Sequence, residues 1–129
     1  MPGMADCLFC RIVAGDVPAS VVRETERTVV FRDIAPQART HLLVVPREHH
    51  QDAAALAGAD PGLLAALVTD AAQAAAVDGI DRSGYRLVFN TGPDSGQTVF
   101  HVHLHVLGGA PLGHFGEPDF GEHRRPSGG

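Results

Sequence analysis

Three histidines stand at alternate positions in the stretch VFHVHLHVLGG, which runs from Val99 to Gly109. Successive side chains of a β-strand point to opposite faces, so His101, His103 and His105 are predicted to share one face. A lone histidine on a strand face is commonly a polar filler, but three in strict alternation after a glycine-rich loop indicate a functional site. The opposite face is predicted to pack in the core and consists of Phe100, Val102, Leu104 and Val106.

Two kinds of chemistry use imidazoles in this pattern. Neutral imidazoles bind zinc, so His101, His103 and His105 could form a catalytic metal site with an open position. Alternatively, one neutral imidazole attacks a phosphorus atom and forms a covalent phosphohistidine, which divides a difficult transfer into two easier steps. The preceding loop NTGPDSGQT, residues 90–98, offers an amide, a hydroxyl and glycine N–H groups that suit an anionic phosphoryl oxygen. The loop therefore favours the nucleophile over the metal site.

The cysteines form a second group with chemical potential. Cys7 and Cys10 are the only two in the chain and make a single C-x-x-C. In a reducing compartment this spacing favours a metal or redox role over a structural disulfide. A thioredoxin-type motif would require a strand before the pair, and too few residues precede Cys7 for that interpretation.

Composition limits the class of protein. With 129 residues, of which 44% are hydrophobic and 19% charged, the chain is predicted to form one domain around one core. Ten arginines and no lysine stand against 15 acidic residues, and this net charge of -5 argues against binding a nucleic acid polymer. A mononucleotide remains compatible, because backbone N–H groups can hold one phosphate. The sequence contains no apolar run long enough to cross a membrane and no secretory signal, so we expect a cytoplasmic protein.

The elements that must position these residues follow from hydrophobic spacing. A short helix is predicted over residues 6–15, and a long helix begins after Asp60 with Pro61 at its first position. The long helix carries an apolar stripe and ends near residue 77. The predicted strands are Val21–Glu24, Thr28–Asp33, Thr40–Pro46, 85–90 and 99–109.

The stretch GQTVFHVHLHVLGG closely resembles the signature of the histidine triad (HIT) family. The segments DCLFCRIVAGDVPA, VVFRDIAPQARTHLLVVPREH and GYRLVFNTGPDSGQT are similar to the Hint branch, the purine nucleoside phosphoramidases, so the resemblance covers residues 6–112. It implies an α+β fold with a five-stranded antiparallel sheet, one long and one short helix, and a homodimer with one extended sheet. Residues 1–5 and 113–129 fall outside this domain, and we expect them to be flexible.

The resemblance also implies roles for individual residues. His103 corresponds to the nucleophile, with His101, His105 and His41 as the other catalytic imidazoles, and Asp33 to the carboxylate that accepts the ribose hydroxyls. The apolar slot for the base would consist of Leu8, Phe9, Ile12, Phe31 and Ile34. The α-phosphate would lie among Asn90, Gly96, Gln97, Thr98, His103 and His105. The competing interpretations are that Phe31 and Ile34 are plain core and that Asp33 forms a turn.

Some HIT relatives bind structural zinc through a C-x-x-C, a histidine after the proline-ended strand and the first histidine of the triad. Here those ligands would be Cys7, Cys10, His49 and His101, and the closed set would not involve His103. His50 is an alternative to His49, and a pair of unliganded thiols is the alternative to a metal site.

The sequence therefore predicts a purine nucleoside 5′-monophosphoramidase that acts through a nucleotidyl-histidine. Two alternatives remain open at this point. The same triad could hydrolyse dinucleoside polyphosphates, or the protein could be a nucleotide-binding regulator with incidental turnover. The apolar base slot contains no hydrogen-bonding groups that would distinguish adenine from guanine.

Overall fold

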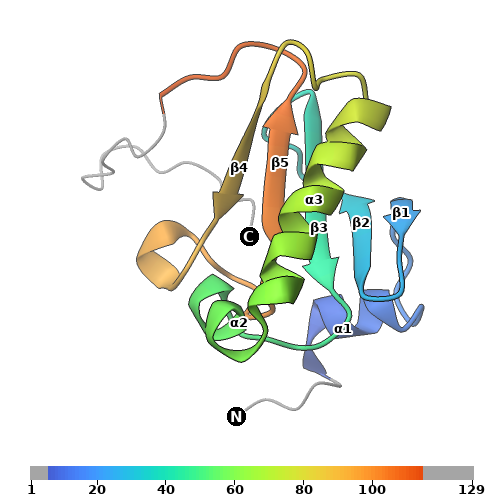
Figure 1. Cartoon of the computed structure of the whole chain (residues 1–129), viewed down its shortest axis with the longest axis vertical. Coiled ribbons are helices and arrows are strands. Elements are labelled where there is room, and N and C mark those ends of the chain that lie inside the picture. The colour runs from blue at the N-terminus through green and yellow to red at the C-terminus, as the bar shows by residue number, and fades with distance from the viewer. Residues whose placement is uncertain (1–5, 115–129) are drawn as a thin grey trace.

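Five antiparallel strands form one sheet in the order β1-β2-β3-β5-β4 (Figure 1). The strands are β1 (Val21–Glu24), β2 (Thr28–Arg32), β3 (Thr40–Pro46), β4 (Tyr85–Phe89) and β5 (Leu104–Gly108). The computed structural model describes residues 6–114. The expected flexibility of residues 1–5 and of the 113–129 segment therefore falls outside the described residues, apart from positions 113 and 114. The α+β class and the five-stranded antiparallel sheet are confirmed.

One face of the sheet is covered by the long helix α3 (Pro61–Val77), as Figure 1 shows. The Asp60 carboxylate accepts a hydrogen bond from the Leu63 N–H at 3.0 Å, which caps the helix at the predicted position. Apolar side chains at spacings of three and four face the sheet and form the main core. The buried helix side of this core consists of Leu63, Leu67, Ala71, Ala74 and Ala75, and the strand side includes Val30, Leu42, Val44, Leu104 and Val106.

The opposite face is covered near β2 and β3 by the short helix α1 (Leu8–Val13). Phe9 is its buried residue, and the Phe9 ring meets the Phe31 ring edge to face at 5.5 Å between centroids. This smaller core also contains Val29, Leu43 and Val45. His101 and His103 lie on this face, because Phe9 also contacts their rings, and His105 lies there beside its sheet partner Leu43.

The histidine segment differs from the prediction in its backbone. The strand β5 begins at Leu104 and not at Val99. The neighbouring strand ends at Pro46, which has no N–H to donate, and the Val102 N–H bonds instead to the carbonyl of His50 at 2.7 Å. Phe100 is 45% exposed, so its predicted place in the core is wrong. The side chains of His101, His103 and His105 still alternate with those of Val102, Leu104 and Val106, which pack in the main core.

The short helix α2 (Ala53–Ala59) was not predicted. Its sequence AAALAGA buries only Leu56, so it has no apolar stripe from which a helix could be predicted. The Asp52 carboxylate caps its start, and Asp60 both ends α2 and caps α3. Among the described residues, no helix combines the length and the apolar character that crossing a bilayer requires.

Candidate active site

His103 is buried, with its ring 4.9 Å from the Phe9 ring and 5.0 Å from the His105 ring between centroids. Its Nδ1 lies 2.7 Å from the carbonyl oxygen of His101. A carbonyl only accepts, so this hydrogen bond places the proton on Nδ1 and the lone pair on Nε2 of the neutral ring. His103 is therefore held in the tautomer in which Nε2 is a nucleophile.

His105 is held in the complementary tautomer by His41. The backbone N–H of Gln37 donates to Nδ1 of His41 at 3.0 Å, so the neutral His41 ring carries its proton on Nε2. That Nε2 lies 2.8 Å from Nδ1 of His105 and 3.4 Å from a carboxylate oxygen of Asp33. Nδ1 of His105 must accept, which leaves the His105 proton on Nε2. The site thus presents a lone pair on His103 and an N–H on His105.

Burial keeps the His41 imidazole neutral. His41 is 3% exposed, and desolvation lowers its pKa, with the His103 ring acting in the same direction and Asp33 opposing it. A neutral His41 is the form that accepts from the Gln37 N–H. The hydrogen-bond chain and the burial therefore favour the same protonation state.

The loop between β4 and the histidines lies beside these rings at Asn90, whose side-chain amide is 3.5 Å from Nε2 of His105. Two donors do not bond to each other, so with the His105 proton on Nε2 it is the amide oxygen of Asn90 that faces this ring and accepts. Gly92 and Gly96 have φ angles of 81° and 97°, a region that only glycine adopts readily, and they give the loop its shape. The Gln97 side chain is buried within the loop, where it accepts from the Gly92 N–H and donates to two backbone carbonyls. Gln97 thus shapes the loop, and the exposed Thr98 hydroxyl is the predicted phosphate donor on its outer side.

The residues predicted to form the base slot have very different exposures. Phe9 and Phe31 are buried at 5% and 3%, Leu8 is 43% exposed, and Ile34 is 98% exposed. Ile34 therefore is not core, and an open edge of this kind lets an apolar ligand gain contacts by covering it. The Asp33 carboxylate accepts from the Ala35 N–H at 2.8 Å, so it forms the turn and faces His41 at the same time.

Leu43 is a site residue that the sequence analysis missed. In the sheet register it pairs with Phe31 on one side and with His105 on the other, so all three side chains lie in one row on the same face. Leu43 is 4% exposed and forms the floor between the apolar slot and the imidazoles. The alternation of His41 and Leu43 within THLLVVP was the available signal.

Four other side chains form a second cluster: Cys7, Cys10, His49 and His101. Nδ1 of His101 lies 3.5 Å from Sγ of Cys7 and 3.4 Å from Sγ of Cys10, and Nδ1 of His49 lies 3.4 Å from Sγ of Cys10. A tetrahedral zinc ion with ordinary bond lengths requires sulfur-to-nitrogen separations of about 3.5 Å. These three separations match edges of a zinc tetrahedron, and all four ligand atoms lie within 4.8 Å of one another.

The tautomer of His101 also suits a metal. Its Nε2 donates to the carbonyl oxygen of Pro46 at 2.8 Å, which leaves the Nδ1 lone pair directed at the two sulfur atoms. Burial lowers the pKa of His101 to about 4, so the ring is neutral. Burial and the bond to Cys7 raise the pKa of Cys10 to about 11, so a metal ion would have to displace its proton.

Two sets of metal ligands were considered from the sequence, the three triad histidines and the cluster of cysteines and histidines, and the structure favours the second. Nδ1 of His101 faces the cysteines, whereas Nδ1 of His103 and Nδ1 of His105 face other partners. Among residues 6–114, the three triad histidines do not form a common ligand set. His50 bonds to Glu48 at 3.3 Å and lies outside the cluster that contains His49. A metal site made of His101, His103 and His105 is thus not supported, and His49 rather than His50 is the candidate ligand in the cysteine cluster.

The family model of the HIT domain matches residues 14–112. The chain belongs to the HIT family. It is 37% identical to the purine nucleoside phosphoramidase of Escherichia coli strain K12 over 108 residues, 84% of this chain and 91% of that protein. A HIT family hydrolase of Legionella pneumophila aligns with a TM-score of 0.81 and 44% identity, covering 84% of this chain and 96% of that one.

A third HIT relative bears on the metal cluster. The structure of a zinc-bound histidine triad family protein from Mycobacterium smegmatis aligns with a TM-score of 0.71 and 36% identity. The alignment covers 91% of this chain and 86% of that one. This HIT protein is thus similar to a hydrolase, to a phosphoramidase and to a zinc-bound member of the family.

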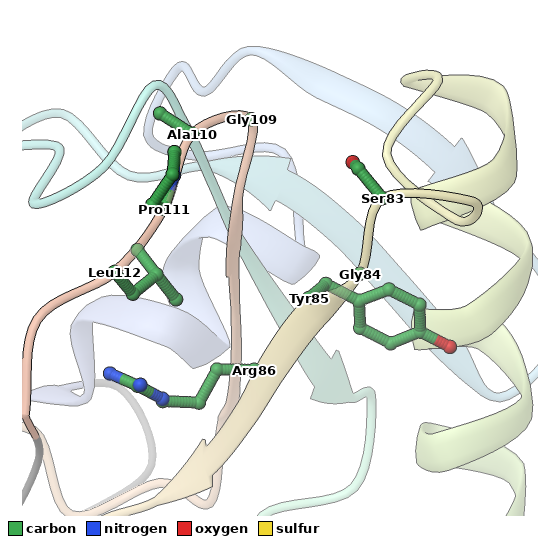
Figure 2. Close-up of a pocket in the computed structure, with 8 residues that line it drawn as sticks. All are labelled: Ser83, Gly84, Tyr85, Arg86, Gly109, Ala110, Pro111 and Leu112. Carbon is green, nitrogen blue, oxygen red and sulfur yellow. The ribbon is translucent and has the colours of Figure 1, made fainter.

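A cavity of about 590 Å³ is lined by residues 83–86 and 109–112, none of which is a histidine (Figure 2). It opens where β4 begins and where the chain leaves β5, and its lining includes Tyr85, Arg86 and Leu112. Tyr85 pairs with Gly108, whereas Phe89 at the other end of β4 pairs with Leu104, next to His103. Along β4 the cavity therefore lies away from His103, although Arg86 stands in the same row of the sheet as Leu107 and His41.

Proposed function

We propose that this HIT protein hydrolyses purine nucleoside 5′-monophosphoramidates through a covalent nucleotidyl-histidine on Nε2 of His103. The observation that carries the proposal is the set of hydrogen bonds to His103, His41 and His105, on rings of His103 and His105 that lie 5.0 Å apart. These bonds imply a lone pair on Nε2 of His103 and an N–H on Nε2 of His105. A nucleophile and a neighbouring hydrogen-bond donor are what attack on an anionic phosphoryl group requires. The similarity to a purine nucleoside phosphoramidase supports the same substrate class.

In the first step, Nε2 of His103 forms a bond to the α-phosphorus, and the bond from phosphorus to the substrate nitrogen breaks. The substrate nitrogen takes up a proton from solvent as this bond breaks, so it leaves as an amine. In the second step, a water molecule attacks phosphorus and releases a proton to solvent, the bond to Nε2 of His103 breaks, and the nucleoside monophosphate is released. The His105 N–H and the Asn90 amide would stabilise the charge on the phosphoryl oxygens in both steps.

Binding of the nucleoside would use the two ends of the apolar face. The base would cover Leu8, Ile12 and Ile34, gaining contact with side chains that are now partly or fully exposed. The ribose hydroxyls would donate to the Asp33 carboxylate, which the Ala35 N–H and His41 hold in place. Gly96 and Thr98 would complete the phosphate site.

We propose that Cys7, Cys10, His49 and His101 hold a structural zinc ion. When bound, zinc would link α1 to the histidine segment without taking part in the phosphoryl transfer. Phe9 lies between the two cysteines and contacts His103 and Phe31, so the cluster would order the apolar slot. The fit of the ligand atoms to a tetrahedron supports this assignment.

We further propose a homodimer that extends the sheet through β4. The edge strands are β1 and β4, and β1 has an irregular register between Val21 and Arg23, which hinders pairing with another chain. The strand β4 pairs regularly with β5 along its length. Sedimentation of a species of roughly twice the 13.6 kDa chain mass would support the dimer, and a monomer at micromolar concentration would contradict it.

The test of the function is a comparison of kcat/KM on an adenosine 5′-phosphoramidate and on a diadenosine polyphosphate. We expect the phosphoramidate value to be higher by at least about tenfold. A higher value on the diadenosine substrate would instead indicate dinucleoside polyphosphate hydrolysis. Tight AMP binding without turnover of either substrate would indicate a regulatory nucleotide-binding protein.

A further inference from the structure

The loop between β2 and β3, residues 33–39, carries several groups that the proposed function uses. Asp33 is the predicted ribose carboxylate, Ile34 is the exposed edge of the base slot, and the Gln37 N–H sets the tautomer of His41. A backbone hydrogen bond from the Asp33 N–H to the His41 carbonyl at 3.0 Å closes the loop. The positions of these loop residues therefore affect the proposed ribose and base contacts and the tautomer of His41.

Both residues that flank the loop bond to one carboxylate on the other side of the sheet. Oδ1 of Asp78 accepts from the Arg32 guanidinium at 2.7 Å, and Oδ2 accepts from the Thr40 hydroxyl at 2.7 Å. Asp78 is the residue at which α3 ends. In Figure 1 the C-terminal end of α3 lies at the same end of the sheet as the end of β2 and the start of β3.

The two contacts of Asp78 affect the nucleotide side of the sheet through the residues that follow Arg32 and Thr40. Arg32 precedes Asp33 and Thr40 precedes His41, and successive strand residues point to opposite faces. A side chain held on the α3 face therefore orients its neighbour toward the nucleotide face. Thr40 is only 6% exposed, so its hydroxyl has little access to water as an alternative partner.

The negative charge of Asp78 strengthens its hydrogen bonds to Arg32 and Thr40. The Arg32 guanidinium and the Thr40 hydroxyl hold the pKa of the Asp78 carboxyl below its usual range. Asp78 is thus ionised, and a carboxylate with two donors restrains both ends of the loop more firmly than a neutral group does.

We propose that Asp78 is a positioning residue for ribose recognition, acting through Arg32 and Thr40 on Asp33. The inference rests on the proposed function, because it takes Asp33 as the ribose carboxylate. It extends the site across the sheet, to a helix end that contacts no nucleotide group itself.

The same helix offers a matched control. Asp70 also faces the sheet from α3 and accepts from a threonine hydroxyl and an arginine, those of Thr28 and Arg23. Those partners lie at the start of β2 and in β1, away from the loop. Asp70→Ala removes the same kinds of contact as Asp78→Ala, so it reports general destabilisation without the proposed effect.

The experiment measures the dissociation constants of AMP and of 2′,3′-dideoxyAMP by calorimetry, which requires no turnover. We expect the wild type to prefer AMP and Asp33→Ala to lose that preference. Asp78→Ala should reduce the ratio of the two constants by about fivefold, because a loosened Asp33 carboxylate bonds the ribose hydroxyls less well. In the Asp33→Ala background, Asp78→Ala should change the ratio by less than about twofold.

Two further variants separate positioning from folding. Asp78→Asn keeps an acceptor for Arg32 and presents an N–H to the Thr40 oxygen but loses the charge, so its ribose preference should lie between those of the wild type and of Asp78→Ala. Thr40→Val removes one contact while keeping the buried shape, and it should lower the preference even if Asp78→Ala fails to fold.

The outcomes are distinguishable. If the wild type binds AMP and the dideoxy analogue equally, the ribose contact of the proposed function fails, and this inference fails with it. If Asp33→Ala abolishes the preference while Asp78→Ala and Thr40→Val leave it intact, the inference about Asp78 alone is wrong. An equal loss in Asp70→Ala and Asp78→Ala would also overturn it, because the effect would then be general destabilisation.

Discussion

The Nδ1–H of His103 donates to the carbonyl oxygen of His101 at 2.7 Å. The residue whose side chain faces the two cysteines thus sets, through its backbone, the tautomer of the imidazole that we propose as the nucleophile. This bond connects the cysteine and histidine cluster that we propose to hold zinc to the imidazole that we propose to react. His101 and His103 can therefore have different proposed roles, one as a zinc ligand and the other as the nucleophile.

Removal of the nucleophile should separate chemistry from binding. His103→Gly is expected to lower kcat/KM on an adenosine phosphoramidate by about a thousandfold or more, because the covalent route is lost. The affinity for AMP should change only a few fold, since the base, ribose and phosphate groups remain. Steady-state kinetics and calorimetry check the two parts. Near-normal kcat in this variant would exclude His103 as the nucleophile.

His105 should contribute less than His103. His105→Ala removes the N–H that faces the phosphoryl group but keeps the attacking nitrogen, so we expect kcat to fall by about 10- to 100-fold. Single-turnover rates measure the chemical step directly. A loss as large as that of His103→Gly would indicate that His105 takes part in the covalent step.

The metal cluster should link stability to substrate affinity. Chelation, or the double change Cys7→Ser and Cys10→Ser, is expected to lower the melting temperature by about 10 °C and to raise KM. The rate of the chemical step at bound substrate should change little, because zinc would not touch His103. Metal analysis of reduced protein should find about one zinc per chain. Well under one zinc with both thiols titratable would show that the cluster is only a pair of buried thiols.

Acid should destabilise the metal-free protein over a defined range. Burial lowers the pKa of His101 to about 4 and also lowers that of His41, so the folded state resists protonation that the unfolded chain accepts below about pH 6.5. Stability should be full above that pH and fall as the pH drops toward 4, by roughly 3 kcal/mol from His101.

Denaturant titrations at several pH values measure this loss. His41→Gln should show a shallower dependence on pH, because one buried imidazole is missing. Replacement of the exposed His114 by glutamine serves as the control and should leave the profile unchanged. A stability that stays constant between pH 7 and pH 5 would contradict the expected effect of the buried rings.

Much of the site was predictable from local patterns. The alternation of His101, His103 and His105 predicted that they share a face. Their side chains alternate as in a strand even though residues 101–103 precede the first residue of β5. Asp60 and Pro61 predicted where α3 begins, since capping depends on neighbouring residues alone.

Other features depend on register and tertiary contact. The place of Leu43 between Phe31 and His105 follows from the pairing of three strands, which local patterns do not determine. The choice of His49 over His50 depends on the loop conformation after β3. The contacts of Asp78 join residues 46 and 38 positions apart in the chain, so no motif could reveal them.

The most direct test of the account is to trap the intermediate. Wild-type protein mixed with an adenosine phosphoramidate, quenched rapidly and digested, should yield one peptide carrying a nucleoside monophosphoryl group on His103, as mass spectrometry of the fragments would locate it. His103→Gly should yield no labelled peptide. The account is contradicted if the label lies on another residue, or if turnover proceeds at the normal rate without any label within the time of a single turnover.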